Sequence, residues 1–490
     1  MNKKDLLSFL KEYSDKNYIP MHMPGAKRSC DVFRNSDFDI DMGNPYSIDI
    51  TEIDGFDNMH NAKGIIKDAF DRTAKIYGAD ESLFLINGST SGNLAAISGT
   101  TFKGNKVLVS RNCHVSVYNA IYLNELNPVY IYPDFDKKLG IYNGVKLEDV
   151  KNALQNNEDI KAVIITSPTY EGNVSEVREI AEYLHSKKIP LIVDEAHGAH
   201  LHFHKDFPES AVDCGADIVI NSVHKTLPSL TQTAVMHINY GLIDVERVKR
   251  YWNIYQSTSP SYVLMASIDR CMSIMENQGK ELFDNYVSNL NNLRCALEKL
   301  KNIHMIETDD ISKIVLACDD GHRLYTELLN RYNIQMEMCS FKYVIAMTSI
   351  CDTPEFYQRF LCALEKIDEQ WESNKPLAND KQTENNKEPE NVVNTLKCIE
   401  CIPCPKPTIK FNIADALNRA DKYGIEEIKV NNVAIYDKIS AGTITIYPPG
   451  IPLVNPGEVI TKEVIDTINS ALETGLEIIG IREGNISCLR

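Results

Sequence analysis

The sequence predicts an α/β fold whose core is a mostly parallel β-sheet covered by helices on both faces. Between about residues 80 and 240, short apolar runs of strand length alternate with segments of helical length. The runs are apolar at nearly every position, which is typical of strands that are buried on both sides. Ligands of such sheets bind beyond the carboxyl ends of the strands, so functional residues should directly follow the runs.

The individual elements follow from these patterns in chain order. Strands are predicted at 83–86, 106–109, 129–132, 162–166, 191–193 and 217–220. Helices are predicted at 91–101, 114–125 and 175–188. The last of these places four apolar side chains on one helical face: Val177, Ile180, Ala181 and Leu184.

The chain is too long for a single compact core, and several domains are expected in its 490 residues. The predicted units are an N-terminal arm with a short amphipathic helix, the large sheet domain, a smaller α+β domain, a linker almost free of large apolar side chains, and a C-terminal α+β domain. Their predicted bounds are 1–30, 31–270, 271–372, 373–397 and 398–490.

Composition narrows the class of protein. No apolar run approaches the roughly 18–20 residues of a membrane span, and the first residues lack the apolar stretch of a signal peptide. The 13 cysteines form no disulfide framework, so reduced thiols and a cytoplasmic location are expected. The net charge of −17 argues against a nucleic-acid partner. An acidic surface can steer a cationic substrate, or can simply keep the protein soluble.

Two candidate site segments follow predicted strands. The turn NGSTSG at 87–92 leaves backbone N–H groups free at a helix start, which suits a phosphate, although Ser and Thr also cap ordinary helices. Asp194, in the motif VDEAHGAH, directly follows the predicted strand 191–193. A carboxylate there can pair with a protonated pyridine nitrogen, or can serve as a simple cap.

Two further segments complete the set. Lys225 is the last residue of the segment Ser222-Val223-His224-Lys225, which follows the predicted strand 217–220. A lysine there can form a Schiff base with an aldehyde, although a solvated lysine is the commoner case. His114 follows another strand and can lie flat on a cofactor ring, or can simply start a helix. A phosphate turn, a histidine, an aspartate and a lysine in this order on one sheet indicate a cofactor site.

These motifs resemble the bacterial ornithine/lysine/arginine decarboxylases, which are fold-type-I enzymes dependent on pyridoxal phosphate (PLP). The resemblance extends over nearly the whole chain, through MHMPGAKR, DITEIDGFDNMH, NGSTSGN, SPTYEG, VDEAHGAHLHFH, SVHKTLPSLTQTAVMHI, STSPSYVLMASID and YPPGIPLVNPGE. The size resembles the short form of Gram-positive bacteria. The resemblance implies decarboxylation of a basic L-amino acid, with arginine favoured over lysine or ornithine, by a PLP-binding large domain.

The same resemblance assigns roles to individual residues. Lys225 is expected to carry PLP and Asp194 to pair with its ring nitrogen. Ala196 and His114 are expected on the two faces of the ring, and His197 near the ring hydroxyl. The residues expected at the phosphate are Thr90, Ser91, Ser222 and His224, together with Ser259 of a partner subunit in a homodimer or larger assembly.

The sequence departs from the family pattern at three motifs. Ala26 stands where the family commonly has His, Asn61-Ala62 where it has His-Pro, and Glu171 where an aromatic residue is common. None of these positions belongs to the predicted PLP core, but all can alter substrate choice. For the distal cation of the substrate, the acidic loop with Glu52, Asp54 and Asp57 is a candidate, or it is merely a solvated loop.

The sequence also allows other functions. His197, His200, His202 and His204 lie close together in sequence; in a strand, the last three would share one face and could bind zinc, but such a site leaves Lys225 unexplained. A metal at Cys398, Cys401 and Cys404 lacks an evident fourth ligand. An aminotransferase or lyase on the same scaffold is the nearest enzymatic alternative, and a non-catalytic binding protein would not need both Asp194 and Lys225.

Overall fold

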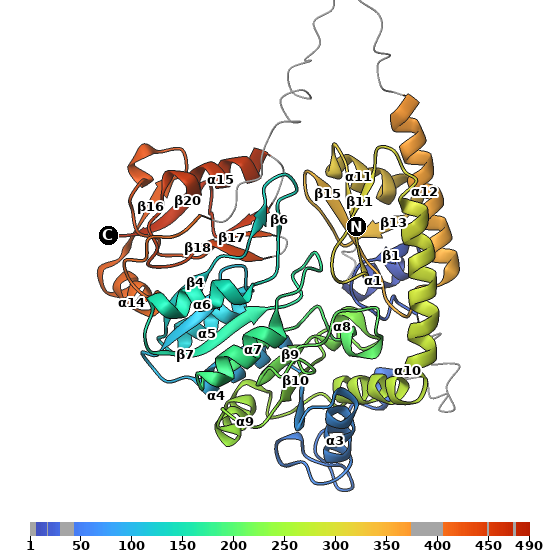
Figure 1. The fold of residues 1–490 in the computed structure, drawn as a ribbon, viewed down its shortest axis with the longest axis horizontal. Coiled ribbons are helices and arrows are strands. Elements are labelled where there is room, and N and C mark those ends of the chain that lie inside the picture. The colour runs from blue at the N-terminus through green and yellow to red at the C-terminus, as the bar shows by residue number, and fades with distance from the viewer. Residues whose placement is uncertain (1–5, 17, 30–43, 374–404, 448–449, 474–476) are drawn as a thin grey trace, which may run out of the picture.

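A computed structural model describes residues 6–16, 18–29, 44–373, 405–447, 450–473 and 477–490 (Figure 1). Its centre is a seven-stranded sheet in the order β2-β10-β9-β8-β7-β3-β4. The strands in that order are Glu81–Leu85, Ala234–Ile238, Ile218–Asn221, Leu191–Asp194, Ile160–Thr166, Lys106–Ser110 and Asn127–Ile131. Within this sheet β10 runs antiparallel to both of its neighbours, and the remaining pairings are parallel.

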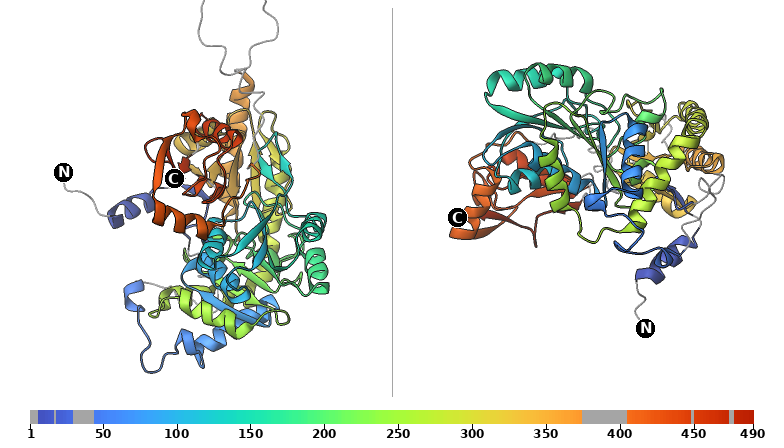
Figure 2. Two further views of the ribbon diagram at one scale, coloured as in Figure 1. Left: turned by 90° about the vertical axis from the view of Figure 1, so that its left-hand side faces the viewer. Right: turned by 90° about the horizontal axis from the view of Figure 1, so that it is seen from below.

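Alternating side chains of these strands enter two separate cores, as the continuous apolar runs predicted. In β7, Val163 and Ile165 belong to one core, whereas Ala162 and Ile164 belong to the other. The first core is closed by α6 (Leu147–Asn156) and α7 (Val177–Ser186). The second is closed by α4, α5 and α9 (Gly88–Thr100, Val115–Leu123 and Val245–Tyr255). Figure 2 shows helices above and below the sheet in its right-hand view.

A second unit is built around a four-stranded antiparallel sheet, β11-β12-β15-β14. Its elements are β11 (His304–Ile306), β12 (Lys313–Ala317), β14 (Met338–Cys339), β15 (Tyr343–Met347), α11 (Gly321–Tyr332) and α12 (Pro354–Ser373). The N-terminal strand β1 (Ile19–Met21) joins it by parallel pairing with β13 (Ile334–Met336). Helix α10 (Tyr262–Leu297) connects this unit to the central sheet and runs through residue 270, where the sequence predicted a boundary.

The last described segment forms a third unit with its own hydrophobic core. It contains the sheet β18-β17-β19 and the pair β16–β20. Its elements are β16 (Ile425–Lys429), β17 (Ile444–Tyr447), β18 (Ile451–Val454), β19 (Glu477–Ile479), β20 (Asn485–Leu489), α14 (Ile413–Tyr423) and α15 (Lys462–Glu473). Figures 1 and 2 show the second and third units on the same side of the central unit.

Short elements complete the described chain. They are α1 (Leu6–Ser14), α3 (Ile65–Tyr77), α8 (Val223–Thr226), β5 (Phe135–Asp136), β6 (Ile141–Tyr142) and the 3-10 turns η1 (Pro45–Ser47), η2 (Met59–Asn61), η3 (Leu201–Phe203) and η4 (Val433–Ile435). The predicted N-terminal helix is therefore present as α1, although Leu6 and Leu10 are exposed. No helix of the described residues is long and apolar enough to cross a membrane.

A buried ion pair ties the third unit to the central sheet. Arg111, which follows β3, donates to Glu458 Oε2 at 3.0 Å and to the carbonyl of Leu453 at 3.0 Å. Both charged side chains are almost fully buried. The guanidinium of Arg111 also lies over the ring of Tyr130, with its central carbon 4.9 Å from the ring centroid. Because Arg111 lies just before Cys113 and His114, this pair also holds the loop that carries His114.

Removal of one partner should expose how much the protein depends on this pair. We expect Glu458→Ala to lower the stability by about 3–5 kcal/mol, because Arg111 would keep an uncompensated buried charge. The matched control is Asp71→Ala, which breaks an exposed pair with Lys67 on α3 and should cost about 0–1 kcal/mol. Urea unfolding of both variants measures the difference, and equal shifts would contradict the expectation.

Candidate active site

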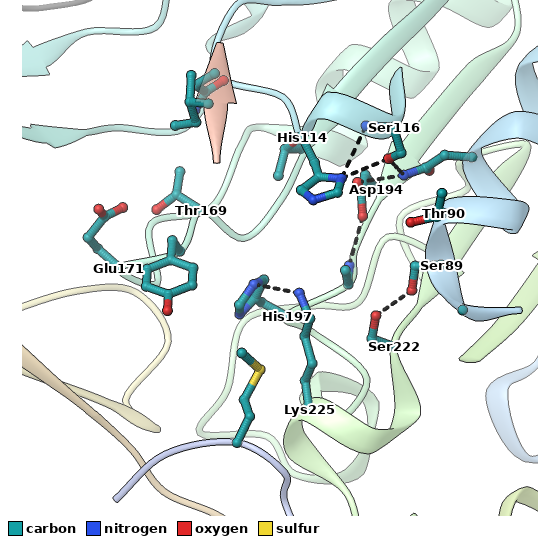
Figure 3. A pocket seen from close by; sticks show the side chains of 18 of the residues that line it. Ser89, Thr90, His114, Ser116, Thr169, Glu171, Asp194, His197, Ser222 and Lys225 are labelled. Carbon is teal, nitrogen blue, oxygen red and sulfur yellow. Dashed lines mark hydrogen bonds between the residues drawn. The ribbon is translucent and has the colours of Figure 1, made fainter. Parts of the chain in front are cut away.

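The carboxyl edge of the central sheet borders a cavity of about 370 Å³, a size typical of small-molecule sites (Figure 3). Its lining draws on loops that follow β2, β3, β7, β8 and β9, because parallel strands end at the same edge. The sequence-predicted residues that line it are Thr90, His114, Ala196, Asp194, His197, Ser222, His224 and Lys225, together with the departure Glu171.

Lys225 lies in the short helix α8, directly after β9. Its Nζ is 2.9 Å from Nε2 of His197. Burial lowers the pKa of Lys225, while the carboxylates of Asp194 and Glu337 act in the opposite direction. The amine is therefore neutral more often than that of an ordinary lysine, which favours addition to a carbonyl group.

Asp194 is the last residue of β8 and is only 3% exposed. Its Oδ2 accepts a hydrogen bond from Asn93 Nδ2 at 2.8 Å, and its Oδ1 accepts one from the backbone N–H of Ala196 at 3.2 Å. Sequence reasoning missed Asn93, although it closes the motif NGSTSGN and lies one helical turn after Thr90. The two donors fix a buried carboxylate that faces the cavity.

Two histidines lie on opposite sides of the cavity, as Figure 3 shows. His114 is the N-cap of α5, and its Nδ1 accepts from the backbone N–H of Ser116 at 3.2 Å. Burial lowers the pKa of His114 and, more strongly, that of His197, where the charge of Lys225 acts in the same direction. A neutral His197 can accept a hydrogen bond from Lys225.

Hydroxyl groups gather at the start of α4. Gly88, with φ of +77°, forms the tight turn after β2, and the side chains of Ser89 and Ser222 hydrogen-bond to each other. Thr90 lines the cavity beside them (Figure 3). His224, also in the lining, donates from Nδ1 to the carbonyl of Thr233 at 2.8 Å. Free backbone N–H groups and hydroxyls at this end suit an anion.

The side chain of Ser91 does not line the cavity, contrary to the prediction. Its hydroxyl donates to the carbonyl of Gly88 at 2.7 Å and accepts from Gln256 Nε2 at 2.8 Å. The helix begins at Gly88 and not at 91, and the hydroxyl of Ser89, two residues before Ser91, lines the cavity.

Ser259 and the acidic loop also lie outside this cavity within the one chain described. Ser259 is exposed in the loop between α9 and α10. Asp57 accepts backbone N–H groups at the start of α3, from Lys63, Gly64, Ile66 and Lys67. Burial raises the pKa of Asp57, but these hydrogen bonds together lower it by more, so this carboxylate serves as a helix cap.

The histidine cluster is not a metal site. The segment forms the 3-10 turn η3 in place of the expected strand, so His200, His202 and His204 do not share a face. They contact three different carboxylates: Asp310, Asp213 and Asp284. Within the described parts of the chain, no three His, Cys, Asp or Glu residues are placed to hold a metal. Cys398, Cys401 and Cys404 and nearly all of the predicted linker lie in 374–404, outside the described residues.

Several lining residues come from segments that sequence reasoning did not connect with the site. Glu337 follows β13 of the second unit, and Ile451 begins β18 of the third. Met23 lies in the MPGAKR segment, where Gly25 approaches the backbone of Leu227 so closely that a Cβ would lie 2.7 Å from its nitrogen. No local pattern marks Glu337, because its position depends on the packing of two units.

Comparisons with known proteins extend over the whole chain. The sequence family described as Orn/Lys/Arg decarboxylase, major domain, matches residues 5–381, and the family described as Orn/Lys/Arg decarboxylase, C-terminal domain, matches residues 399–480. The arginine decarboxylase of Bacillus anthracis is 31% identical over 99% of this chain and 96% of its own. That of Bacillus subtilis is 30% identical over 99% of this chain and 97% of its own.

Solved structures agree at the level of the fold. The constitutive lysine decarboxylase of Escherichia coli superposes with a TM-score of 0.75 at 19% identity, over 99% of this chain and 81% of that one. The lysine decarboxylase of Francisella novicida gives a TM-score of 0.74, also at 19% identity, over 98% and 80%. The serine palmitoyltransferase of Sphingomonas wittichii gives 0.52 at 16% identity, over 63% and 77%.

The electrostatic balance around Lys225 is testable in ligand-free protein. Reductive methylation requires the neutral amine, so its pH dependence, followed by peptide mass, reports the pKa of Lys225. We expect a midpoint below 10.5 in the native protein and a lower one in Asp194→Asn, because Asp194 is the anion that most raises this pKa. Glu179→Gln, a change on the exposed side of α7, should leave the midpoint in place. A midpoint that rises in Asp194→Asn would contradict the proposed balance.

Proposed function

The chain belongs to the Orn/Lys/Arg decarboxylase family, and from this premise we propose that it decarboxylates a basic L-amino acid to the corresponding amine and CO₂ with PLP as its cofactor. The observation that carries the proposal is one cavity lined by a buried carboxylate, Asp194, and a lysine of lowered pKa, Lys225. A hydroxyl-lined helix start at the same cavity provides for the phosphate.

The residues present fit this cofactor. Asp194 is a buried carboxylate with no ion pair among the described residues, and a protonated ring nitrogen would supply the missing cation. Nδ1 of His197 is buried without a hydrogen-bond partner in the described part of the chain, and a ring hydroxyl would be one. Ser89, Thr90 and Ser222 offer hydroxyls where a phosphate would lie.

Each residue has a definite task in the proposed reaction. Lys225 would hold the cofactor covalently and yield its place to the substrate amine. When bound, PLP supplies an electron sink for the bond that loses CO₂. Asp194 would keep a proton on the ring nitrogen, because Asn93 and the Ala196 N–H hold the carboxylate in place. His114 would lie against the ring, and His197 would exchange a proton with the amine of Lys225 at 2.9 Å.

Arginine is the favoured substrate, followed by lysine or ornithine. Two relatives matched over 99% of this chain are arginine decarboxylases, whereas two of the named fold neighbours are lysine decarboxylases. An aminotransferase or another lyase on this scaffold remains the alternative. The products separate these functions, because transamination yields a keto acid and no CO₂.

The function is tested by incubating the protein with PLP and each of L-arginine, L-lysine and L-ornithine, with products identified by mass. We expect CO₂ and agmatine, cadaverine or putrescine, respectively, for the amino acid that is the substrate. Borohydride reduction should attach the pyridoxyl group to Lys225, and Lys225→Ala should remove both label and product. The buried Lys313 and Lys27 serve as internal controls. A keto-acid product, or label on another lysine, would contradict the proposal.

We further propose a homodimer with shared sites. The loop Ser257–Tyr262 lies outside its own chain's cavity and is fixed against the acidic loop, since the hydroxyl of Tyr262 donates to the carbonyl of Asp57. The ring of Tyr262 contacts Phe56, whose side chain is 51% exposed. A polar loop next to exposed aromatic surface suits a two-fold interface, in which Ser259 would reach the partner's phosphate site.

Complementation tests the shared sites. Lys225→Ala and Ser259→Trp chains should each be inactive, but an equal mixture should regain about a quarter of native activity. Random pairing makes half of the dimers mixed, and each mixed dimer has one intact site. Lys225→Ala mixed with Asp194→Ala is the control without rescue, because both changes affect the same chain's side of a site. Absence of rescue after confirmed subunit exchange would show that each chain completes its own site.

A further inference from the structure

Two carboxylates other than Asp194 line the cavity in the described residues, and neither has a role in holding the cofactor. Glu171 lies in the loop after β7, and Glu337 follows β13. Figure 3 shows Glu171 beside Thr169, on the side of the cavity away from Ser89, Thr90 and Ser222. The cavity therefore has a carboxyl group, that of Glu171, at the end opposite to its hydroxyl-lined end.

Glu337 is held in a fixed orientation. Its Oε2 accepts the backbone N–H of Met23 at 2.8 Å, and its Oε1 accepts the hydroxyl of Tyr170 at 2.6 Å. The ring of Tyr170 in turn contacts His197 edge to face, at 5.1 Å, and His197 contacts Lys225. Each carboxylate oxygen can accept a second hydrogen bond, so the orientation leaves capacity for a ligand.

The charge of Glu337 also reaches the reactive amine. It is the second carboxylate, after Asp194, that opposes the lowering of the pKa of Lys225 by burial. Glu337 and Lys225 also line the same cavity, so a cation on an amino acid bound at Lys225 can meet the carboxylate of Glu337.

Glu171 is a buried carboxylate without a cation. It is 7% exposed, and its Oε1 accepts the hydroxyl of Tyr343 at 3.1 Å. Burial raises its pKa, and neither Glu171 nor Glu337 forms an ion pair within the described parts of the chain. A buried carboxyl group that has the hydroxyls of Tyr343 and Thr169 as donors, but no cation, is stabilised in its charged form by a cation that enters the cavity.

We propose that Glu337 and Glu171 form an anionic subsite that binds the distal ammonium or guanidinium group of the substrate. This inference rests on the proposed decarboxylation of a basic amino acid and adds the residues that select the distal charge. It also gives a function to Glu171, which departs from the aromatic residue common in the family. Asp57 has no part in this subsite, because its carboxylate caps α3.

The test compares each cationic amino acid with a neutral one of similar shape: L-arginine with L-citrulline, and L-lysine with L-norleucine. Native protein should favour the cationic member in kcat/KM. Glu337→Gln and Glu171→Gln should each lower that preference by roughly 10–100-fold, because each replaces a charged acceptor by a neutral one. The matched control, Glu179→Gln on the exposed side of α7, should leave the preference unchanged.

Binding of agmatine or cadaverine, measured by calorimetry, gives a readout without turnover. Each variant should weaken it by the same factor as the preference falls. If Glu337→Gln does not fold, Glu171→Gln carries the test, because its amide oxygen still accepts from Tyr343.

The outcomes separate the two proposals. Native protein that acts on neither arginine, lysine nor ornithine overturns the proposed function. Native protein that decarboxylates one of them, with a preference over the neutral analogue that both variants retain within about 3-fold, overturns the subsite alone. An equal loss on cationic and neutral substrates would show a structural role and would also overturn it.

Discussion

The parallel direction of β3, β7, β8 and β9 is the constraint on which the site depends. Parallel strands need crossover helices, and these helices bury both faces of the sheet, so its strands are apolar nearly throughout. Polar residues are then confined to the strand ends. Because the carboxyl ends share one edge, His114, Asp194 and Lys225 meet there although 111 positions separate the first from the last.

Burial of charge at that edge explains the chemistry. Removal from water lowers the pKa values of Lys225, His114 and His197. The carboxylates of Asp194 and Glu337 limit this lowering for the lysine. The protein thus balances a reactive amine between desolvation, which neutralises it, and two fixed anions, which retain its proton. The same low dielectric would strengthen the attraction of Asp194 for the protonated ring of the proposed cofactor.

The second and third units complete the cavity that the sheet begins. The second supplies Glu337 and, through Tyr343, a hydrogen bond to Glu171. The third supplies Ile451 and, through Glu458, the buried partner of Arg111. Since Arg111 is in the loop that leads to His114, packing of the third unit and placement of a site residue are physically coupled.

The sequence alone determined what depends on local pattern. The strand runs and the helix 175–188 correspond to β2, β3, β4, β7, β8, β9 and α7, because burial on a sheet imposes a regular pattern on neighbouring residues. Motif resemblance was enough to identify the decarboxylase family and to nominate Lys225 and Asp194. The resemblance also assigned Thr90 and Ser91 to the phosphate, whereas the local pattern set the helix start at 91 and the helix begins at Gly88.

Only the tertiary structure decided the rest, because contacts between distant segments leave no local pattern. Ser91 turns to Gln256, Asp57 caps α3, and the three histidines of the η3 segment separate toward different carboxylates. Glu337 is 112 positions from Lys225 in sequence, and its charge acts on that lysine only because the second unit packs on the sheet. A residue's type can be read from the chain, but its neighbours are set by how the units pack.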